Sequence, residues 1–324
     1  RHRGRRVDIK SLLDTYYWLT RDELRALCLS ALDDCEKKLR KYEMKHGASG
    51  LTLSQSYQAG RLRVLEDEIN GILTELSGNM YDTLKVHSIN AYQTGVVFNN
   101  YLIDSSVPFS VPFSGVNKHL MMESVSKEIA GMTLKDRVTP ERLQLLFSER
   151  EAVAKASMLG WGEKKTAKQI MTDDLKEGID KSFRQCLNIA RTEMTRNCTA
   201  GYIQNQAELR DEYNLDIRSK WLSAGGERTR MAHKWLNGRE ATEWRNGRYE
   251  FEWNGHYSPG PGMWGIASMD CNCRCRNTSI VMGYEEFYPT DKTYLRWVEQ
   301  NMVHSDNSYS RDMGAKIVAE YKVA

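Results

Sequence analysis

The residues best suited to hold a metal ion are three closely spaced cysteines and two upstream histidines. Cys271, Cys273 and Cys275 occupy alternate positions, and His233 or His256 could add an imidazole. Thiolate sulfur and imidazole nitrogen are ligands that zinc takes in tetrahedral sites. Two residues of an extended strand span about 7 Å, which would keep alternate sulfurs from meeting at one ion. Two interpretations stay open: zinc bound by His233, Cys273 and Cys275, or free thiols packed beneath tryptophans. Apart from this zinc, we expect no cofactor.

A second group of residues has side chains suited to acid–base chemistry or to clamping an anion. These residues are Arg191, Glu193, Arg228, His233 and Glu240. Their spacing does not fix their mutual geometry, and the sequence lacks a Gly-x-Ser-x-Gly motif, a His-Glu-x-x-His motif and a phosphate loop. The sequence therefore predicts that these side chains organise the fold and that the chain is not an enzyme.

Composition narrows the class of protein and its partners. The chain has 324 residues, of which 40% are hydrophobic and 27% charged, so it can bury a core. Its 46 basic and 43 acidic residues nearly balance, which excludes a protein dedicated to coating DNA and allows at most a weak DNA contact. No run of 18 apolar residues is present, so we expect no membrane partner. The basic stretch Arg1–Arg6 is either a solvated terminus or an arm that contacts nucleic acid or an acidic partner.

The first hundred residues have the periodicity of long helices. Thr20 and Glu23 have the spacing of a capping box, which predicts a helix start at Thr20. Cys28 and Cys35 lie on the apolar stripe of that helix, so we expect them in the core. A second helix is predicted from residue 62 to about 103. It contains three glycines that we expect to be weak points: Gly71, Gly78 and Gly95.

The later part of the chain changes character. Strands are predicted at 216–222 and 276–282, with a short helix at 228–235 between them. Asn246-Gly247, between two alternating segments, predicts a β-hairpin. The fold class is therefore α+β and mostly α, with a long N-terminal helical region followed by a small α+β module that contains a hairpin.

We expect three regions along the chain. Residues 1–150 form a helical domain, residues 151–290 form the small module, and residues 291–324 form a C-terminal tail. A further helix is predicted to begin after the cap at Thr139.

The order of motifs between about 150 and 282 resembles the phage head morphogenesis family, also called the Mu F-like minor head proteins. An Arg-Thr-Glu motif is followed by a tryptophan, an Arg-Thr-Arg-x-x-His block, a Leu-Asn-Gly turn and finally Asn-Cys-Arg-Cys. The residues that carry this resemblance are Arg191, Glu193, Trp221, Arg228, Arg230, His233, Gly238, Asn272 and Arg274.

The resemblance implies a structural minor head protein of a tailed phage, located at the capsid interior or portal vertex and in the host cytoplasm during assembly. It implies a role in head assembly, DNA packaging or DNA delivery, with the portal protein or major capsid protein as partner. Residues 1–150 would make that attachment. The alternatives are a nucleotide-dependent transferase or toxin-like enzyme, for which Glu193 would matter, and a DNA-binding ejection protein.

Overall fold

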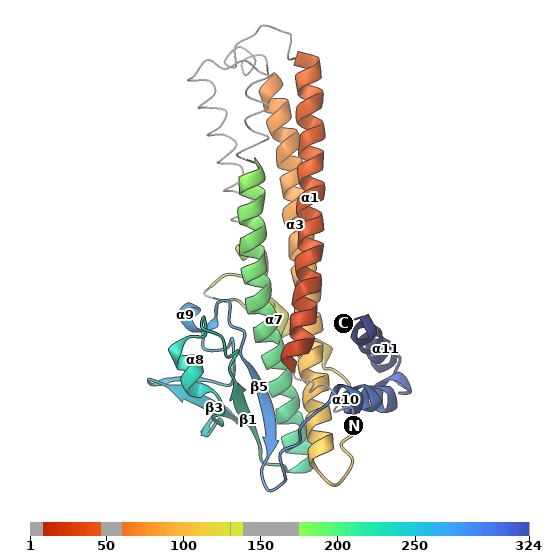
Figure 1. Ribbon diagram of the computed structural model, residues 1–324, viewed down its shortest axis with the longest axis vertical. Coiled ribbons are helices and arrows are strands. Elements are labelled where there is room, and N and C mark those ends of the chain that lie inside the picture. Colours follow the sequence, from red (N-terminus) through yellow and green to blue (C-terminus); the bar gives the residue numbers. More distant parts are fainter. Residues whose placement is uncertain (1–8, 47–59, 130, 139–174, 324) are drawn as a thin grey trace. The chain divides into compact units, whose positions relative to one another are not determined.

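The computed structural model describes residues 9–46, 60–129, 131–138 and 175–323. The domain boundary expected near 150, the helix expected after Thr139 and the basic stretch Arg1–Arg6 lie outside these ranges. The fold is α+β and mostly helical, as predicted (Figure 1).

The chain forms two compact units, each assembled from separate stretches of sequence. The first unit comprises residues 1–18, 86–130 and 190–324, and the second comprises 19–85 and 131–189. Each of the long helices α1 (Ile9–His46), α3 (Arg61–Ser106) and α7 (Lys176–Tyr213) contributes one segment to each unit.

Helix α3 agrees with its predicted extent, but the predicted start of α1 is wrong. Helix α1 begins at Ile9, and Thr20 lies inside it with none of its surface exposed. The apolar stripe continues towards the N-terminus through the buried Leu13 and Tyr16, so tertiary packing extends the helix past the capping signal.

In the second unit the apolar stripes of the helices form the core. Cys28 and Cys35 are buried there, as predicted, and burial raises the pKa of the Cys28 thiol to about 12. The Cys186 sulfur of α7 lies 3.6 Å from the Met80 sulfur of α3. Lys38 and Glu68 join α1 to α3 by an ion pair of 2.9 Å.

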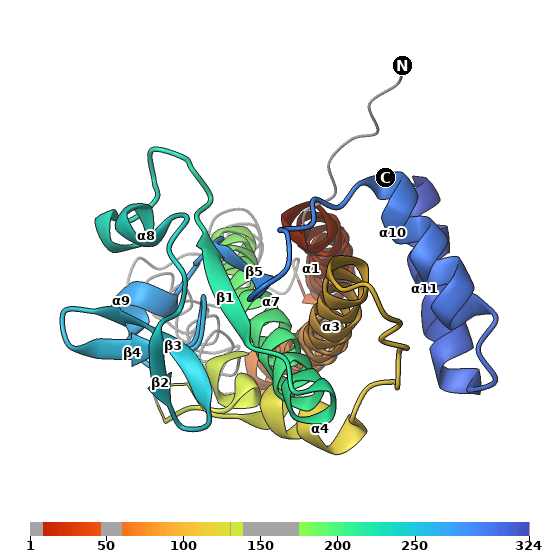
Figure 2. The ribbon, with the colours of Figure 1, turned by 90° about the horizontal axis from the view of Figure 1, so that it is seen from below.

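The first unit contains a two-stranded sheet packed on the second half of α7. Strands β1 (Ile217–Leu222) and β5 (Arg276–Val281) pair antiparallel, both as predicted. The backbone N–H of Ser279 in β5 donates to the buried Tyr202 hydroxyl of α7 over 2.8 Å. Figure 2 shows both strands alongside α7. The sheet therefore fixes the chain just after the cysteine segment against this helix.

A second, three-stranded sheet contains the predicted hairpin. Strands β2 (Glu243–Arg245), β3 (Arg248–Trp253) and β4 (His256–Ser258) pair antiparallel in that order. Asn246 and Gly247 adopt φ values of 51° and 74°, the left-handed conformation that this tight turn requires.

Short helices complete the first unit. Helix α10 (Asp291–Val298), which the sequence reasoning missed, packs Trp297 against Tyr101 of α3, and the Trp297 indole donates to Asp104 over 2.7 Å. The remaining short elements are α4 (Lys118–Ser126), α8 (Met231–Leu236), α9 (Ala267–Asp270), η2 (Glu299–Val303) and α11 (Ser308–Val323). Within the described ranges, no helix has the length and apolar character needed to cross a bilayer.

Two glycines let α3 and α7 approach closely in the first unit. A Cβ atom on Gly95 would lie 2.1 Å from the Cys198 carbonyl oxygen, and one on Gly201 would lie 2.2 Å from the Tyr92 carbonyl oxygen. Both contacts are with backbone, which cannot move aside as a flexible side chain can. Gly95, expected to be a weak point, is therefore a packing requirement, whereas a Cβ atom on Gly71 or Gly78 meets no described atom within 4 Å.

We predict opposite effects for two alanine substitutions in α3. Gly95→Ala should lower the free energy of unfolding by about 2 kcal/mol or more, because the helices must separate. Gly78→Ala should raise it by about 0.5–1 kcal/mol, because alanine favours the helix and meets no neighbour. Urea denaturation followed by circular dichroism measures both. Equal stability of the two variants would contradict the close approach.

Candidate metal centre

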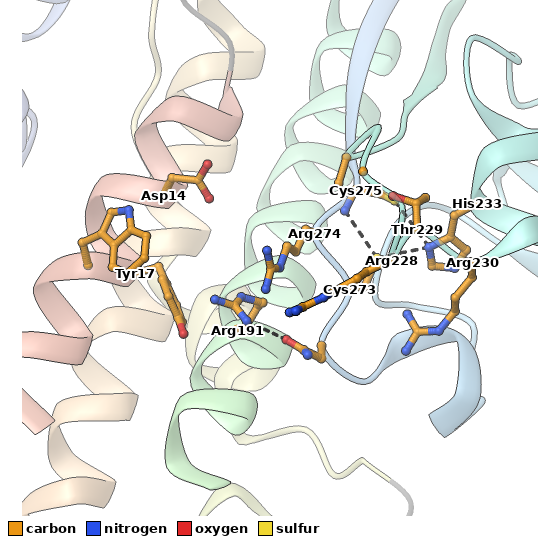
Figure 3. Close-up of a pocket in the computed structure, with 14 residues that line it drawn as sticks. Asp14, Tyr17, Arg191, Arg228, Thr229, Arg230, His233, Cys273, Arg274 and Cys275 are labelled. Carbon is orange, nitrogen blue, oxygen red and sulfur yellow. Dashed lines mark hydrogen bonds between the residues drawn. The ribbon is translucent and has the colours of Figure 1, made fainter. Parts of the chain in front are cut away.

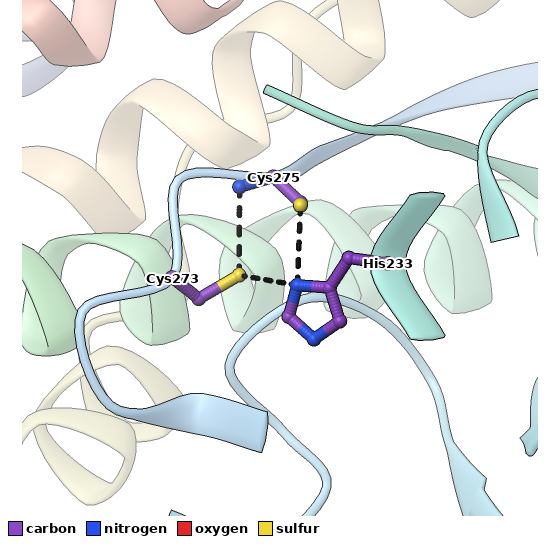
Figure 4. Close-up of side chains that lie close together, drawn as sticks. All are labelled: His233, Cys273 and Cys275. Carbon is purple, nitrogen blue, oxygen red and sulfur yellow. Dashed lines mark hydrogen bonds between the residues drawn. The ribbon is translucent and has the colours of Figure 1, made fainter. Parts of the chain in front are cut away.

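His233, Cys273 and Cys275 come together in the interior of the first unit (Figure 4). His233 Nδ1 lies 3.6 Å from the Cys273 sulfur and 3.4 Å from the Cys275 sulfur. The three candidate ligand atoms all lie within 4.8 Å of one another, and each residue is only 2% exposed. Two thiols and one imidazole at these separations could hold one metal ion.

The backbone around the cysteines explains why they converge. Helix α9 ends before Cys271, Asn272 adopts a φ of 56°, and β5 begins only at Arg276. The cysteines therefore occupy a turn rather than a strand, and the expectation that alternation would keep Cys273 and Cys275 apart is wrong. Cys271 is exposed and is not part of the cluster, and neither is the exposed His256.

Hydrogen bonds fasten this turn to α7 and to the segment before α8. Thr195 of α7 donates its hydroxyl to the Cys273 carbonyl over 2.8 Å, and the Asn272 N–H donates to the Thr192 hydroxyl over 2.9 Å. Arg230 donates to the Cys271 carbonyl over 2.6 Å. The turn is thus held from two sides independently of the cluster itself.

The pKa values of the two buried thiols, Cys273 and Cys275, are shifted in opposite directions. The pKa of Cys275 is lowered to about 4, first by the hydrogen bond from the Cys273 thiol and then by His233. The pKa of Cys273 is raised well above its ordinary value, because its thiol donates to Cys275 and is buried. The cluster therefore favours one thiolate beside one thiol, and these are the residues that could bind a cation.

A pocket of about 420 Å³ lies beside the cluster (Figure 3). His233, Cys273 and Cys275 form part of its wall. Within the described part of the chain, Asp14 is the single carboxylate that lines it. Four arginines also line it: Arg191, Arg228, Arg230 and Arg274.

Arg191 is a partly buried positive charge in the wall of this pocket. This guanidinium lies 3.9 Å from the Tyr17 ring centre and donates to Asn272 over 2.8 Å. Burial lowers the pKa of Arg191, and the charges of Arg274 and Arg276 act in the same direction. Crowded guanidinium groups favour an anionic ligand, since an anion relieves their mutual repulsion.

The structure separates the predicted signature residues into two groups. Arg191, Arg228, Arg230, His233, Asn272 and Arg274 line the pocket, whereas Glu193, Trp221, Gly238 and Glu240 do not.

Three members of the second group, Glu193, Trp221 and Gly238, support the fold. The Glu193 carboxylate is buried and accepts hydrogen bonds from Arg196 at 2.8 Å and Asn197 at 3.2 Å. Gly238 adopts a φ of 79° and donates its N–H to the Trp221 carbonyl over 2.8 Å, and Trp221 is fully buried. Glu240 is exposed.

Sequence reasoning missed three residues at this site: Thr195, Asp14 and Tyr17. Thr192, which belongs to the Arg-Thr-Glu motif, and Thr195 hold the cysteine turn, and the available signal for Thr195 was its place three residues after Thr192, on the same helix face. Asp14 and Tyr17 come from α1, and no pattern in the sequence indicated that they would line this pocket.

Comparison with known proteins finds two relatives of different kinds. The chain is 28% identical over 307 residues to the NAD(+)–arginine ADP-ribosyltransferase EFV of Enterococcus faecalis, a match that covers 91% of the chain and 61% of that protein. It is 24% identical over 286 residues to the minor head protein GP7 of Bacillus phage SPP1, which covers 85% of the chain and 87% of that protein. No family model and no solved structure matches.

These findings correct one expectation and support another in outline. The expectation that the chain is not an enzyme is wrong, because a relative matched over 91% of the chain carries the name of an ADP-ribosyltransferase. The chain spans only 61% of the length of that relative, so the match does not by itself assign the ADP-ribosyltransferase activity to this chain. The similarity to a phage minor head protein agrees with the resemblance in the motifs.

We predict that Glu193→Gln lowers the free energy of unfolding by about 3 kcal/mol, because Arg196 loses a buried ionic partner. The matched control is Glu177→Gln on the same helix, where the pair with Lys181 is exposed and the expected change is below about 0.5 kcal/mol. Urea denaturation of both variants tests this. If Glu193→Gln is as stable as the control, the carboxylate does not serve the fold.

Proposed function

We propose that this chain is a minor head protein of a tailed bacteriophage that attaches to the portal vertex. The observation that carries the proposal is the match to the SPP1 minor head protein, which extends over most of both chains. A match of this extent covers the helical regions as well as the cysteine-containing module. The proposed location is the capsid interior or portal vertex, and the proposed role is head assembly, DNA packaging or DNA delivery.

The helical second unit offers side chains suited to attachment. Leu29 of α1 is 58% exposed, and Val64 of α3 is 61% exposed. Leu29 lies close to the buried Leu24 and Cys28 in sequence but outside the apolar stripe that they form. Exposed aliphatic side chains on long helices can bury their surface against another protein. The proposed partner is the portal protein or the major capsid protein.

Co-expression with the portal protein of the same phage tests this attachment. The full chain should co-sediment with portal rings, and Leu29→Glu should weaken binding at least about tenfold, because a charge would be buried at the interface. The control Lys41→Glu alters an exposed residue of the same helix and should bind as the unaltered chain does. If the chain co-sediments neither with the portal protein nor with the major capsid protein, the proposed role is rejected.

A second candidate function is transfer of ADP-ribose from NAD⁺ to an arginine side chain, with release of nicotinamide. The observation that favours it is the 28% identity to the enterococcal protein of that name. The arginine-lined pocket is the place where this chain could hold the pyrophosphate of a dinucleotide. A guanidinium group can donate two parallel hydrogen bonds to two oxygens of one phosphate. Glu193 is buried in its ion pair and does not line this pocket.

Incubation with NAD⁺ labelled in its adenosine part, together with agmatine as an arginine-like acceptor, tests the transfer. We predict labelled agmatine, and at least about a tenfold loss of NAD⁺ affinity in Arg274→Ala, which removes one phosphate ligand. Arg25→Ala, at an exposed position of α1, is the control. If neither NAD⁺ binding nor labelled product is detected with the full chain, the second candidate is rejected.

A further inference from the structure

We propose that His233, Cys273 and Cys275 bind one zinc ion whose fourth coordination position opens into the arginine-lined pocket. This site is independent of both proposed functions, because it rests only on the arrangement of the side chains. The fourth ligand is then water or an anionic group drawn into the pocket.

The distances from the His233 nitrogen to the two sulfurs match a zinc site. With bonds of about 2.3 Å to sulfur and 2.0–2.1 Å to nitrogen, tetrahedral zinc sets its nitrogen and sulfur ligands about 3.6 Å apart. The corresponding distances from His233 Nδ1 are 3.6 Å and 3.4 Å. An imidazole nitrogen takes part in one strong hydrogen bond, so it cannot satisfy two thiols equally, whereas a metal ion satisfies all three atoms.

The surroundings of the sulfurs suit metal-bound thiolates. The Cys275 N–H points at the Cys273 sulfur over 3.4 Å, and the Ala224 backbone makes a hydrogen bond with Cys275. Backbone N–H groups aimed at sulfur stabilise its negative charge and orient it. Trp221 packs edge-on against the His233 ring at 5.3 Å between ring centres and restricts its rotation.

A zinc ion here would join segments distant in sequence within a small module. It would connect α8 to the turn before β5, across the 40 residues that separate His233 from Cys273. Apart from Cys273 and Cys275 themselves, the apolar cluster around it has five buried members among the described residues, including Trp221 and Phe251. Small modules with limited cores are commonly stabilised by a metal ion.

We place the fourth ligand on the pocket side. Among the described residues the cluster contains no further cysteine, histidine or carboxylate. The cluster residues share the pocket wall with Arg228 and Arg274, both of which are exposed. Structural zinc sites are closed by four protein ligands, whereas a site with three keeps a position for water or another ligand. The neighbouring guanidinium groups favour an anion at that position.

Metal analysis of the full chain, purified without a histidine tag or chelator, tests the site. We expect about one zinc per chain, and after exchange with cobalt the intense visible absorption of tetrahedral Co²⁺ with thiolate-to-cobalt charge-transfer bands. Cys273→Ser and His233→Ala should each lower the zinc content at least about fivefold. Cys271→Ser and His256→Ala, which alter an exposed cysteine and an exposed histidine, should keep it.

Folding of the variants is checked separately by circular dichroism. The unaltered chain decides the question even if a variant does not fold. If its zinc content is below about one tenth per chain and added cobalt gives no charge-transfer band, the site does not exist.

Inorganic phosphate added to the cobalt-loaded protein tests the open position. We expect phosphate to shift the visible bands of the unaltered chain, with at least about a tenfold weaker apparent affinity in Arg274→Ala. Bands that stay unchanged at saturating phosphate would show a closed site and overturn the open fourth position.

Discussion

The cysteine turn depends on a buried polar surface of α7. Thr192 and Thr195 bind the backbone of the turn, and the ion pair of Glu193 with Arg196 lies beside them. A buried polar group without a hydrogen-bond partner destabilises the folded state. The polar side chains of α7 therefore need the backbone of the turn as a partner, and the turn needs them. The same helix approaches α3 through Gly201, where no side chain fits between the backbones. Helix α7 thus connects the packing of the first unit to the geometry of the cluster.

Local sequence signals predicted the elements of the fold well. Apolar periodicity indicated α3, because its buried stripe repeats with the period of a helix. Asn246-Gly247 indicated the hairpin, because a tight turn with positive φ at both positions favours those residues. The start of α1 was missed, because packing of Leu13 and Tyr16 in the core outweighs a local capping signal.

The candidate site could be predicted only in part. Its residue types were evident, but the convergence of Cys273 and Cys275 requires the positive φ of Asn272 and support from a helix far away in sequence. Apolar periodicity in the sequence indicates neither a positive φ at Asn272 nor a contact with a distant helix. Arg191 and Glu193 are two residues apart, yet one lines the pocket and the other is buried in an ion pair. Helical geometry places residues two apart on different faces, so their adjacency in a motif does not give them a common role.

The two relatives point to different uses of a similar chain. One is named as a structural part of a phage head and the other as an enzyme, and both matches extend over most of this chain. The cysteine turn is held by hydrogen bonds within the first unit, and the neighbouring pocket favours an anion. Both features are compatible with a structural role in a phage head and with an enzyme.

An electron cryomicroscopy map of heads purified from cells that produce the phage would show whether the chain is built into the head. We expect density for the long helices α1, α3 and α7 at the portal vertex. Heads that assemble with the chain expressed but show no such density there or on the inner capsid wall would contradict this expectation.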